Sequence, residues 1–150
     1  MTSVDLVITK EIRIEAPRET VFSFLTEPDQ IVRWSGTEAD LNPTPGGIYK
    51  VQMTPEAIAI GEYVEVTPHS RVVFTWGWDG APADGVPPGS STVAIDLKAD
   101  GDATILTLTH TGLPEAAVEQ HAGGWDYFLG RLVVVGAGGD PGPINIGGPH

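Results

Sequence analysis

The 150-residue sequence contains no cysteine, and it carries only eight Lys and Arg residues against 20 Asp and Glu, for a formal net charge of −12. Without cysteine no disulfide can form, so the cysteine content does not indicate whether the protein works in an oxidising or a reducing compartment. We take the cytoplasm as the expected location. Nucleic-acid backbones and anionic membrane surfaces are bound by clustered cations, and the few basic residues of this chain are spread along it. We therefore expect neither partner and interpret the acidic excess as a source of solubility.

Long apolar runs are also missing. No stretch approaches the ~20 apolar residues that span a bilayer, and the first residues lack the basic region and apolar run of a secretory signal. Membrane insertion is therefore not expected. The length suits one domain with one core. We expect that domain at residues 1–138 and a flexible or extended tail at residues 139–150, which are rich in Gly and Pro.

Hydrophobic periodicity predicts one strand, then two short helices, about six antiparallel strands and one long helix. Residues 6–16 alternate between apolar and polar and predict a half-buried strand. Pro17 suits the first position of a helix, and a second short helix is expected from Asp29 to Trp34. Short turns then join alternating segments at residues 48–53, 57–66, 71–78, 91–99 and 103–111.

Consecutive hairpins predict one curved antiparallel sheet, and the fold class is therefore α+β. A long helix beginning at Pro114 is the largest apolar element left to cover the inner face of this sheet. Its apolar side includes Trp125 and Leu132 at helical spacing. Residues 36–47 are expected to form a loop. Residues 79–91 are rich in Gly and Pro and predict either a lid that gates entry to the interior or an irregular excursion.

Two glycines, Gly123 and Gly124, stand in the middle of the long helix. Each costs a helix about 1 kcal/mol relative to alanine, whereas burial of Trp125 or Phe128 contributes ~1.5–3 kcal/mol. The helix can therefore persist. One interpretation is a close approach of helix and sheet, where a side chain would clash; the other is open space left for a ligand. Close approach is the commoner reason and is favoured.

A set of segments spread along the chain forms a recognisable pattern. It consists of residues 12–28, 31–34 and 61–78, residues 104–114, Gly46, Gly47, Tyr49, His121, Gly124, Trp125, Leu129, Arg131 and Leu132. Together these segments resemble the START-like, or SRPBCC, helix-grip superfamily, and most of all its branch related to activators of the Hsp90 ATPase. The resemblance extends from Ile8 to Pro143. One departure is Ser35, because members often have a second aromatic residue after the position of Trp34.

The resemblance implies a helix-grip fold: a curved antiparallel sheet wrapped around the long C-terminal helix, two short helices after the first strand, and a hydrophobic cavity between helix and sheet. It does not imply one activity, because members carry lipids, bind hormones, cyclise polyketides, shield antibiotics or serve as co-chaperones. The residues expected to line the cavity, with ordinary core packing as the alternative, are Trp34, Tyr49, Met53, Phe74, Trp76, Trp78, His110, His121, Trp125 and Phe128.

The histidines are the weak candidates for catalysis. His121 lies one turn before Trp125 on the same helix face, and His110 shares the inward face of its strand with Leu106 and Leu108. Either could act as an acid or base, but no nucleophile or paired carboxylate accompanies them. The sequence therefore leans away from an enzyme.

The other polar groups of the sequence do not indicate a particular ligand, metal or cofactor. Arg33 and Glu62 are further candidates for the cavity; if Tyr63 points inward, Glu62 is solvated, which is the favoured arrangement. No metal site is expected, because cysteine and an HExxH motif are absent and the histidines lie on separate elements. No glycine motif has the spacing of a nucleotide-binding loop, and no cofactor is expected.

Three functions stay open from the sequence. The first is a non-enzymatic binding protein for a small, mostly hydrophobic molecule. The second is a cyclase, dehydratase or hydrolase that uses His110 or His121 as general base. The third is a stress-related partner of a chaperone, which rests on family analogy alone. A homodimer is compatible with an isolated domain of this kind, and the identity of the ligand is not specified by the sequence.

Overall fold

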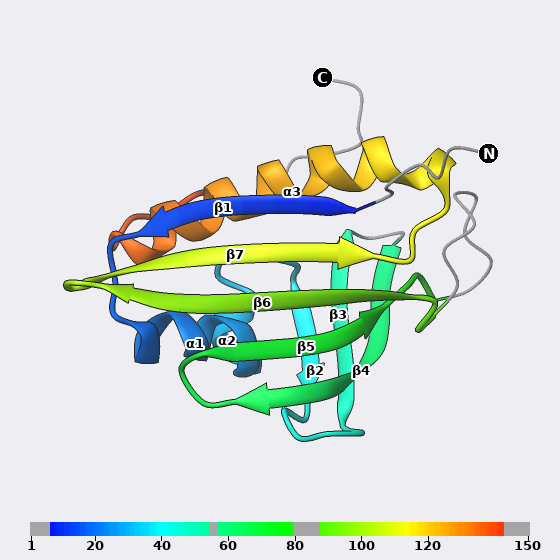
Figure 1. Cartoon of the computed structure of the whole chain (residues 1–150), viewed down its shortest axis with the longest axis horizontal. Helices are drawn as coiled ribbons and strands as arrows, with labels where there is room; N and C mark the ends of the chain where they lie inside the picture. Colours follow the sequence, from blue (N-terminus) through cyan, green and yellow to red (C-terminus); the bar gives the residue numbers. More distant parts are fainter. Residues whose placement is uncertain (1–6, 55–56, 80–87, 143–150) are drawn as a thin grey trace.

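A computed structural model of the chain describes residues 7–54, 57–79 and 88–142. Its strands form one antiparallel sheet of seven strands in the order β1-β7-β6-β5-β4-β3-β2, as Figure 1 shows. In chain order the elements are β1 (Ile8–Ile14), α1 (Arg18–Thr26), α2 (Pro28–Ile31), β2 (Glu38–Leu41), β3 (Ile48–Thr54), β4 (Ala57–Thr67), β5 (Arg71–Trp76), β6 (Ser91–Asp100), β7 (Ala103–Thr111) and α3 (Glu115–Gly136).

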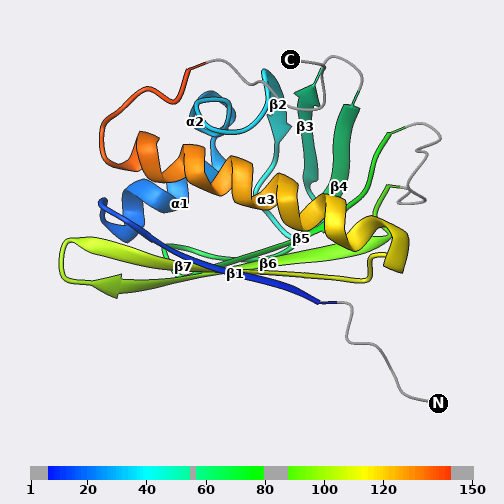
Figure 2. The same cartoon turned by 90° about the horizontal axis from the view of Figure 1, so that it is seen from above.

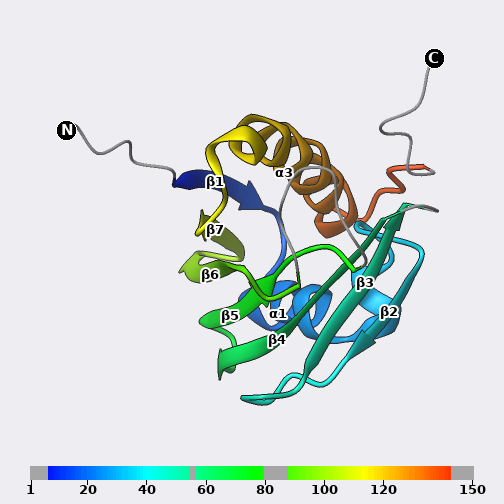
Figure 3. The ribbon, with the colours of Figure 1, turned by 90° about the vertical axis from the view of Figure 1, so that its right-hand side faces the viewer.

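The sheet curls from β1 round to β2, and α3 lies across its open side (Figures 2 and 3). The helices α1 and α2 follow β1 directly, as the sequence predicts. The predicted helix-grip arrangement, a curved antiparallel sheet around a long C-terminal helix, is thereby confirmed. The inner face of the sheet is the only side that α3 covers, so the core lies between this helix and the strands.

Period-two alternation places the core side chains of the central strands. In β6, Val93 and Ile95 are buried, and their partners across the antiparallel pair are His110 and Leu108 of β7. Alternate residues of a strand point to opposite faces of the sheet, so these side chains all face α3. The inward orientation predicted for His110 follows from the same register.

Glycine is required in β4 where the strand changes its pairing partner. A Cβ on Gly61 would overlap with the backbone carbonyl of Thr75. Beyond this point β4 leaves its pairing with β3 and pairs with β5, beginning at Tyr63. Tyr63 is buried and Glu62 is exposed, so the phenol faces the core and the carboxylate faces solvent.

Close approach of α3 to the sheet occurs at Gly136 rather than at the central glycines. A Cβ on Gly136 would overlap with the side chain of Ile14 in β1. A Cβ on Gly123 or Gly124 would meet no atom within 4 Å. The interpretation of the central glycines as a close contact with the sheet is therefore wrong.

Three local predictions differ from the structure. The segment 36–47 is not all loop, because it contains β2, which pairs with β3. The second helix is shorter than predicted and ends at Ile31, since residues 32–34 form a turn. Strand β5 ends at Trp76, and Trp78 forms an isolated bridge to Ala59. The short length of β2 and its half-exposed alternation explain why it was missed.

The described part of the chain contains no helix with the length and hydropathy needed to cross a membrane. The C-terminal residues that are described contact α3: Gly139 N–H donates to the carbonyl of Val134, and the guanidinium of Arg131 donates to the carbonyl of Pro141 at 3.3 Å. Most of the predicted loop 79–91 and of the predicted tail lies outside the described residues.

Candidate ligand-binding site

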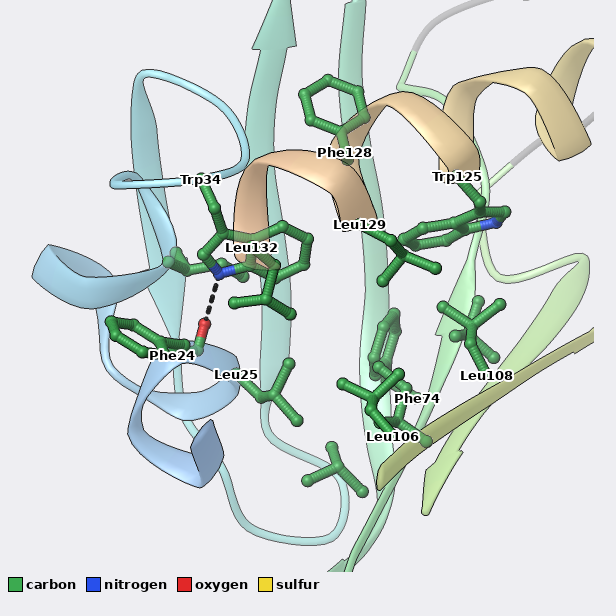
Figure 4. Close-up of a cluster of buried hydrophobic side chains, with 14 of the residues drawn as sticks. Phe24, Leu25, Trp34, Phe74, Leu106, Leu108, Trp125, Phe128, Leu129 and Leu132 are labelled. Atoms are coloured by element: carbon green, nitrogen blue, oxygen red, sulfur yellow. Dashed lines mark hydrogen bonds between the residues drawn. The ribbon is translucent and has the colours of Figure 1, made fainter. Parts of the chain in front are cut away.

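The side chains predicted to line a cavity are buried, except for Trp78, which is half-buried. Their apolar members pack in one continuous core, in which the ring centroids of Tyr49 and Phe74 lie 6.2 and 6.5 Å from that of Trp76. Near α1 and α2, Tyr49 stacks on Phe74 with ring centroids 4.0 Å apart and an interplanar angle of 12°. The indole N–H of Trp34 donates to the carbonyl of Phe24 at 2.9 Å (Figure 4).

Trp34, Ser35 and Tyr63 have hydrogen-bond partners in this part of the interior. Ser35, which stands where relatives often have an aromatic residue, is buried and donates to the sulfur of Met53 at 3.4 Å. Figure 4 shows Leu129 of α3 above Phe74 of the sheet, and Leu132 of the same helix near Trp34 and Leu25. Trp34, Tyr49, Met53, Phe74 and Phe128 thus lie in the buried hydrophobic core, and a role for them in ligand binding stays a prediction from the sequence.

The remaining predicted residues converge beneath the N-terminal half of α3. Trp76, at the end of β5, lies with its ring centroid 5.2 Å from that of Trp125 and 5.4 Å from that of Trp78. The centroids of His110 and His121 are 5.5 Å apart, and Trp78 lies 5.7 Å from His121. We call these five residues the aromatic–imidazole cluster.

Hydrogen bonds within this cluster have a fixed direction. The indole N–H of Trp125 can only donate, so Nδ1 of His110, 3.0 Å away, accepts. The proton of the neutral His110 ring is therefore on Nε2, which donates to Ser91 Oγ at 2.9 Å. Ser91 Oγ in turn donates to the carbonyl of Trp76 at 2.9 Å. Both ring nitrogens of His110 are used.

The environment of His110 keeps this ring neutral. His110 is fully buried, and burial, with a smaller contribution from the neighbouring His121, lowers its pKa from 6.5 to about 3. A charged ring would have no acceptor at Nδ1, since Trp125 offers only a donor there. His110 is therefore a structural hydrogen-bonding residue at neutral pH.

Ser91 is the residue of this site that was not predicted. It occupies the first position of β6 and is 2% exposed. The alternation that places Val93 and Ile95 inward also places Ser91 inward, which is the signal that could have identified it. A buried hydroxyl at an inward position of a strand needs a partner, and His110 is that partner.

Within the part of the chain that the structure describes, two buried polar atoms of the cluster have no hydrogen-bond partner. His121 is 6% exposed and donates Nδ1–H to the carbonyl of Ala117 at 2.9 Å, while its Nε2 is buried and unpaired. The indole Nε1–H of Trp76, a residue that is 2% exposed, is also buried and unpaired. Such groups cost about 1–3 kcal/mol each when left unsatisfied.

Open space adjoins the cluster at Gly124, three residues after His121. A Cβ at Gly124 would meet no atom within 4 Å, although the residue itself is half-buried. Asp126 forms an ion pair with Lys10 of β1 at 2.9 Å and so marks the side of α3 that faces β1. At about 100° per residue, Gly124 projects about 160° away from Asp126.

Comparison with known proteins identifies the family. Residues 15–136 match the family described as Activator of Hsp90 ATPase homolog 1-like protein. This chain belongs to that family. A comparison with curated protein sequences gives no match.

Solved structures agree with this assignment. An AHSA1-like protein from Rhizobium etli is 43% identical, with a TM-score of 0.73 over 99% of this chain and 95% of that chain. DynU16, from the dynemicin biosynthetic locus, is 26% identical with a TM-score of 0.78; the match covers 92% of this chain and 49% of DynU16, so this chain spans about half its length. An Hsp90 activator from Plasmodium falciparum is 25% identical, with a TM-score of 0.68 over 85% and 95% of the two chains.

The remaining polar candidates lie outside the interior of this AHSA1-like fold. Arg33 and Glu62 are exposed. The guanidinium of Arg33 lies over the ring of Phe24 and donates to Gln30 at 3.0 Å. The described residues contain no group of three or more His, Asp or Glu side chains that could hold a metal ion. Among the described residues, the buried side-chain polar atoms without a hydrogen-bond partner belong to the aromatic–imidazole cluster.

Proposed function

We propose that this AHSA1-like chain is a non-enzymatic binding protein that holds a small, mostly apolar molecule between α3 and the sheet, at the aromatic–imidazole cluster. The observation that carries the proposal is the pair of buried, unpaired polar atoms, Nε1 of Trp76 and Nε2 of His121, within a group of aromatic rings. Buried polar groups in folded proteins are normally paired. A bound molecule with a polar group would complete this pair.

The surroundings favour a molecule of this kind. Ligand sites are commonly apolar and aromatic with a few placed polar groups, and the rings of Trp76, Trp78 and Trp125 supply such a surface. The open space at Gly124 adjoins His121 on the side of α3 that faces away from β1. This gives a route for a ligand beside the helix and an explanation for a glycine that makes no close contact.

The same geometry speaks against the catalytic alternative. A serine activated by histidine must give its proton to the ring, whereas Ser91 receives a hydrogen bond from His110 and donates to the carbonyl of Trp76. Among the described residues, the hydrogen bonds of His110 and His121 go to Ser91, Trp125 and Ala117. None of these is a carboxylate or phenol that could complete a general-base pair.

Contact with a chaperone has support only from the family and from the Plasmodium falciparum relative, which is an Hsp90 activator. Large apolar side chains that are exposed in the described part of the chain come from separate segments: Val7, Ile48, Val64 and Val134. They do not favour one docking element. A cytoplasmic location and a homodimer likewise remain predictions from the sequence.

Native mass spectrometry of the purified chain, followed by thermal-shift screening against lipids, aromatic compounds and polyketide-like compounds, tests the proposal. We expect a retained apolar molecule or a compound that raises the melting temperature. Gly124→Phe should abolish binding by filling the open space, whereas Gly123→Phe, on the exposed side of the same helix, should retain it. Absence of any bound compound, or equal binding by both variants, would contradict the proposal.

A further inference from the structure

We infer that the ligand carries a hydroxyl group on an apolar, ring-containing body, and that this hydroxyl bridges Nε1 of Trp76 and Nε2 of His121. The inference rests on the proposed function and names the chemistry of the molecule that the site selects. It depends on the different hydrogen-bonding roles of the two unpaired atoms.

The role of each atom is fixed by the protein. Nδ1 of His121 lies 2.9 Å from the carbonyl of Ala117, which can only accept, so Nδ1 carries the proton. In the neutral ring Nε2 therefore presents a lone pair and accepts. The indole Nε1–H of Trp76 can only donate. The site thus offers one buried donor and one buried acceptor.

The missing partner must accept from Trp76 and donate to His121. A hydroxyl group does both through one oxygen atom. An ether or ketone oxygen accepts but cannot donate, and a carboxylate would place a lone pair against that of His121 Nε2. An ammonium donates but cannot accept. Of the groups compared, only the hydroxyl both accepts and donates through one atom.

The rings that carry the two atoms are neighbours. The ring centroids of Trp76 and His121 are 6.4 Å apart with an interplanar angle of 81°. One oxygen that bonds two atoms at ~2.9 Å requires them to lie at most about 6 Å apart, so the inference requires this separation between Nε1 of Trp76 and Nε2 of His121.

Neighbouring rings define the body of the ligand. Trp78 lies 5.7 Å from His121 and 5.4 Å from Trp76, and it is only half-buried. Offset or edge contacts with indole rings stabilise an aromatic partner by about 0.5–1.5 kcal/mol beyond area burial. We therefore expect the hydroxyl group to be carried by a flat aromatic body that contacts these indole rings.

Matched compounds separate the hydroxyl from the apolar body. The probes form two triads, each with a hydroxyl compound, its methyl ether and the parent hydrocarbon on the same ring system. The first triad is phenol, anisole and benzene, and the second is 2-naphthol, 2-methoxynaphthalene and naphthalene. Binding to the full chain is measured by isothermal titration calorimetry. We expect the hydroxyl member of a triad to bind at least about tenfold more tightly than the methoxy member, because only the hydroxyl can donate to His121.

Two variants should respond in different ways. His121→Phe removes the acceptor, so it should bring the hydroxyl member down to the affinity of the methoxy member and leave the methoxy member unchanged. Trp76→Phe removes the donor, so it should weaken both relative to the parent hydrocarbon. Because Trp76 is a core residue, an independent measurement uses the native chain: 2-naphthol should shift the indole N–H resonance of Trp76, and naphthalene should not reproduce that shift.

The outcomes distinguish this inference from the proposed function. If the hydroxyl and methoxy members bind equally, the hydroxyl inference is wrong while apolar binding stands. The inference is also wrong if none of the triad compounds binds and a ligand without a hydroxyl group does bind. It is likewise wrong if a water molecule bridges the two nitrogens and stays there in the 2-naphthol complex. If no probe and no screened compound binds, the inference and the proposed function both fail.

Discussion

The indole N–H of Trp125 donates to Nδ1 of His110 across 3.0 Å, and this contact joins α3 to the inner face of β7. It fixes the tautomer of a fully buried imidazole. His110 therefore donates from Nε2 to Ser91, and Ser91 donates to the carbonyl of Trp76. The relation makes His110 a structural element of the interior. Of the two histidines of the cluster, His121, one turn before Trp125, keeps a buried ring nitrogen that has no hydrogen-bond partner among the described residues.

Ser91→Ala tests the direction of this hydrogen-bond chain. The substitution removes the acceptor of His110 Nε2–H and leaves a buried donor unpaired, which should lower the free energy of unfolding by about 1–3 kcal/mol. Denaturant unfolding measures the loss. Ser90→Ala, at the exposed neighbouring position, should change the stability little. Equal stability of the two variants would show that the Ser91–His110 bond is not formed.

The lowered pKa of His110 predicts a pH-dependent stability. The pKa of His110 falls from 6.5 to about 3 on burial, so below pH 6.5 the unfolded chain binds a proton that the folded chain does not. Stability is therefore lost as the pH falls from 6.5 towards about 3, with a slope of up to about 1.4 kcal/mol per pH unit. Above pH 6.5 this residue contributes no slope.

Unfolding curves measured across this range should show a smaller slope for His110→Gln than for the native chain, because glutamine does not titrate. His69→Asn is the matched control: His69 is exposed and has a φ of 67°, which asparagine tolerates. Carboxylates titrate in the same range in every variant, so only the difference between variants counts. An unchanged slope in His110→Gln would refute the assignment.

Much of the fold could be predicted from the sequence because its signals are periodic. The alternation of residues 103–111 places Leu106, Leu108 and His110 on one face, and the structure buries all three. The spacing of His121 and Trp125 on one helix face likewise brings their rings into one cluster with Trp76. Period and spacing specify which way a side chain points.

The site was only partly predictable, because the face to which a side chain points does not specify the groups that it contacts. Trp34 and Trp76 were expected to play the same part, yet the indole N–H of Trp34 is paired with a backbone carbonyl and that of Trp76 is not. That difference depends on residues distant in sequence. Ser91 was overlooked because the strand was judged by its apolar members alone, and β2 because its alternation is half-exposed.

The glycines of α3 should respond oppositely to substitution by alanine. Gly136→Ala should destabilise the fold by about 1–3 kcal/mol, because its Cβ would overlap with the buried side chain of Ile14. Gly123→Ala adds helix propensity in open space and should stabilise it by about 0.5–1 kcal/mol. Thermal and denaturant unfolding of the two variants checks the signs. Stabilisation by Gly136→Ala would contradict the close contact of α3 with β1.

Arg131 connects the C-terminal half of α3 to the packed half of the interior. It is 8% exposed, and its Nε donates to the carbonyl of Trp34 at 2.9 Å. Arg131→Met keeps an unbranched side chain but removes every donor, so the buried carbonyl loses its charged partner. Hydrogen bonds to charged groups contribute about 1.5–3 kcal/mol, and the free energy of unfolding should fall by that amount.

Arg33→Met provides the comparison for Arg131. Arg33 is exposed, and its contact with the ring of Phe24 contributes at most about 1 kcal/mol. Denaturant unfolding of both variants under one condition should therefore show the larger loss for Arg131→Met. Because the aromatic–imidazole cluster lies at the other half of α3, ligand affinity at a temperature where both variants are folded should not change. A selective loss of affinity in Arg131→Met would mean that the two halves of the interior are not independent.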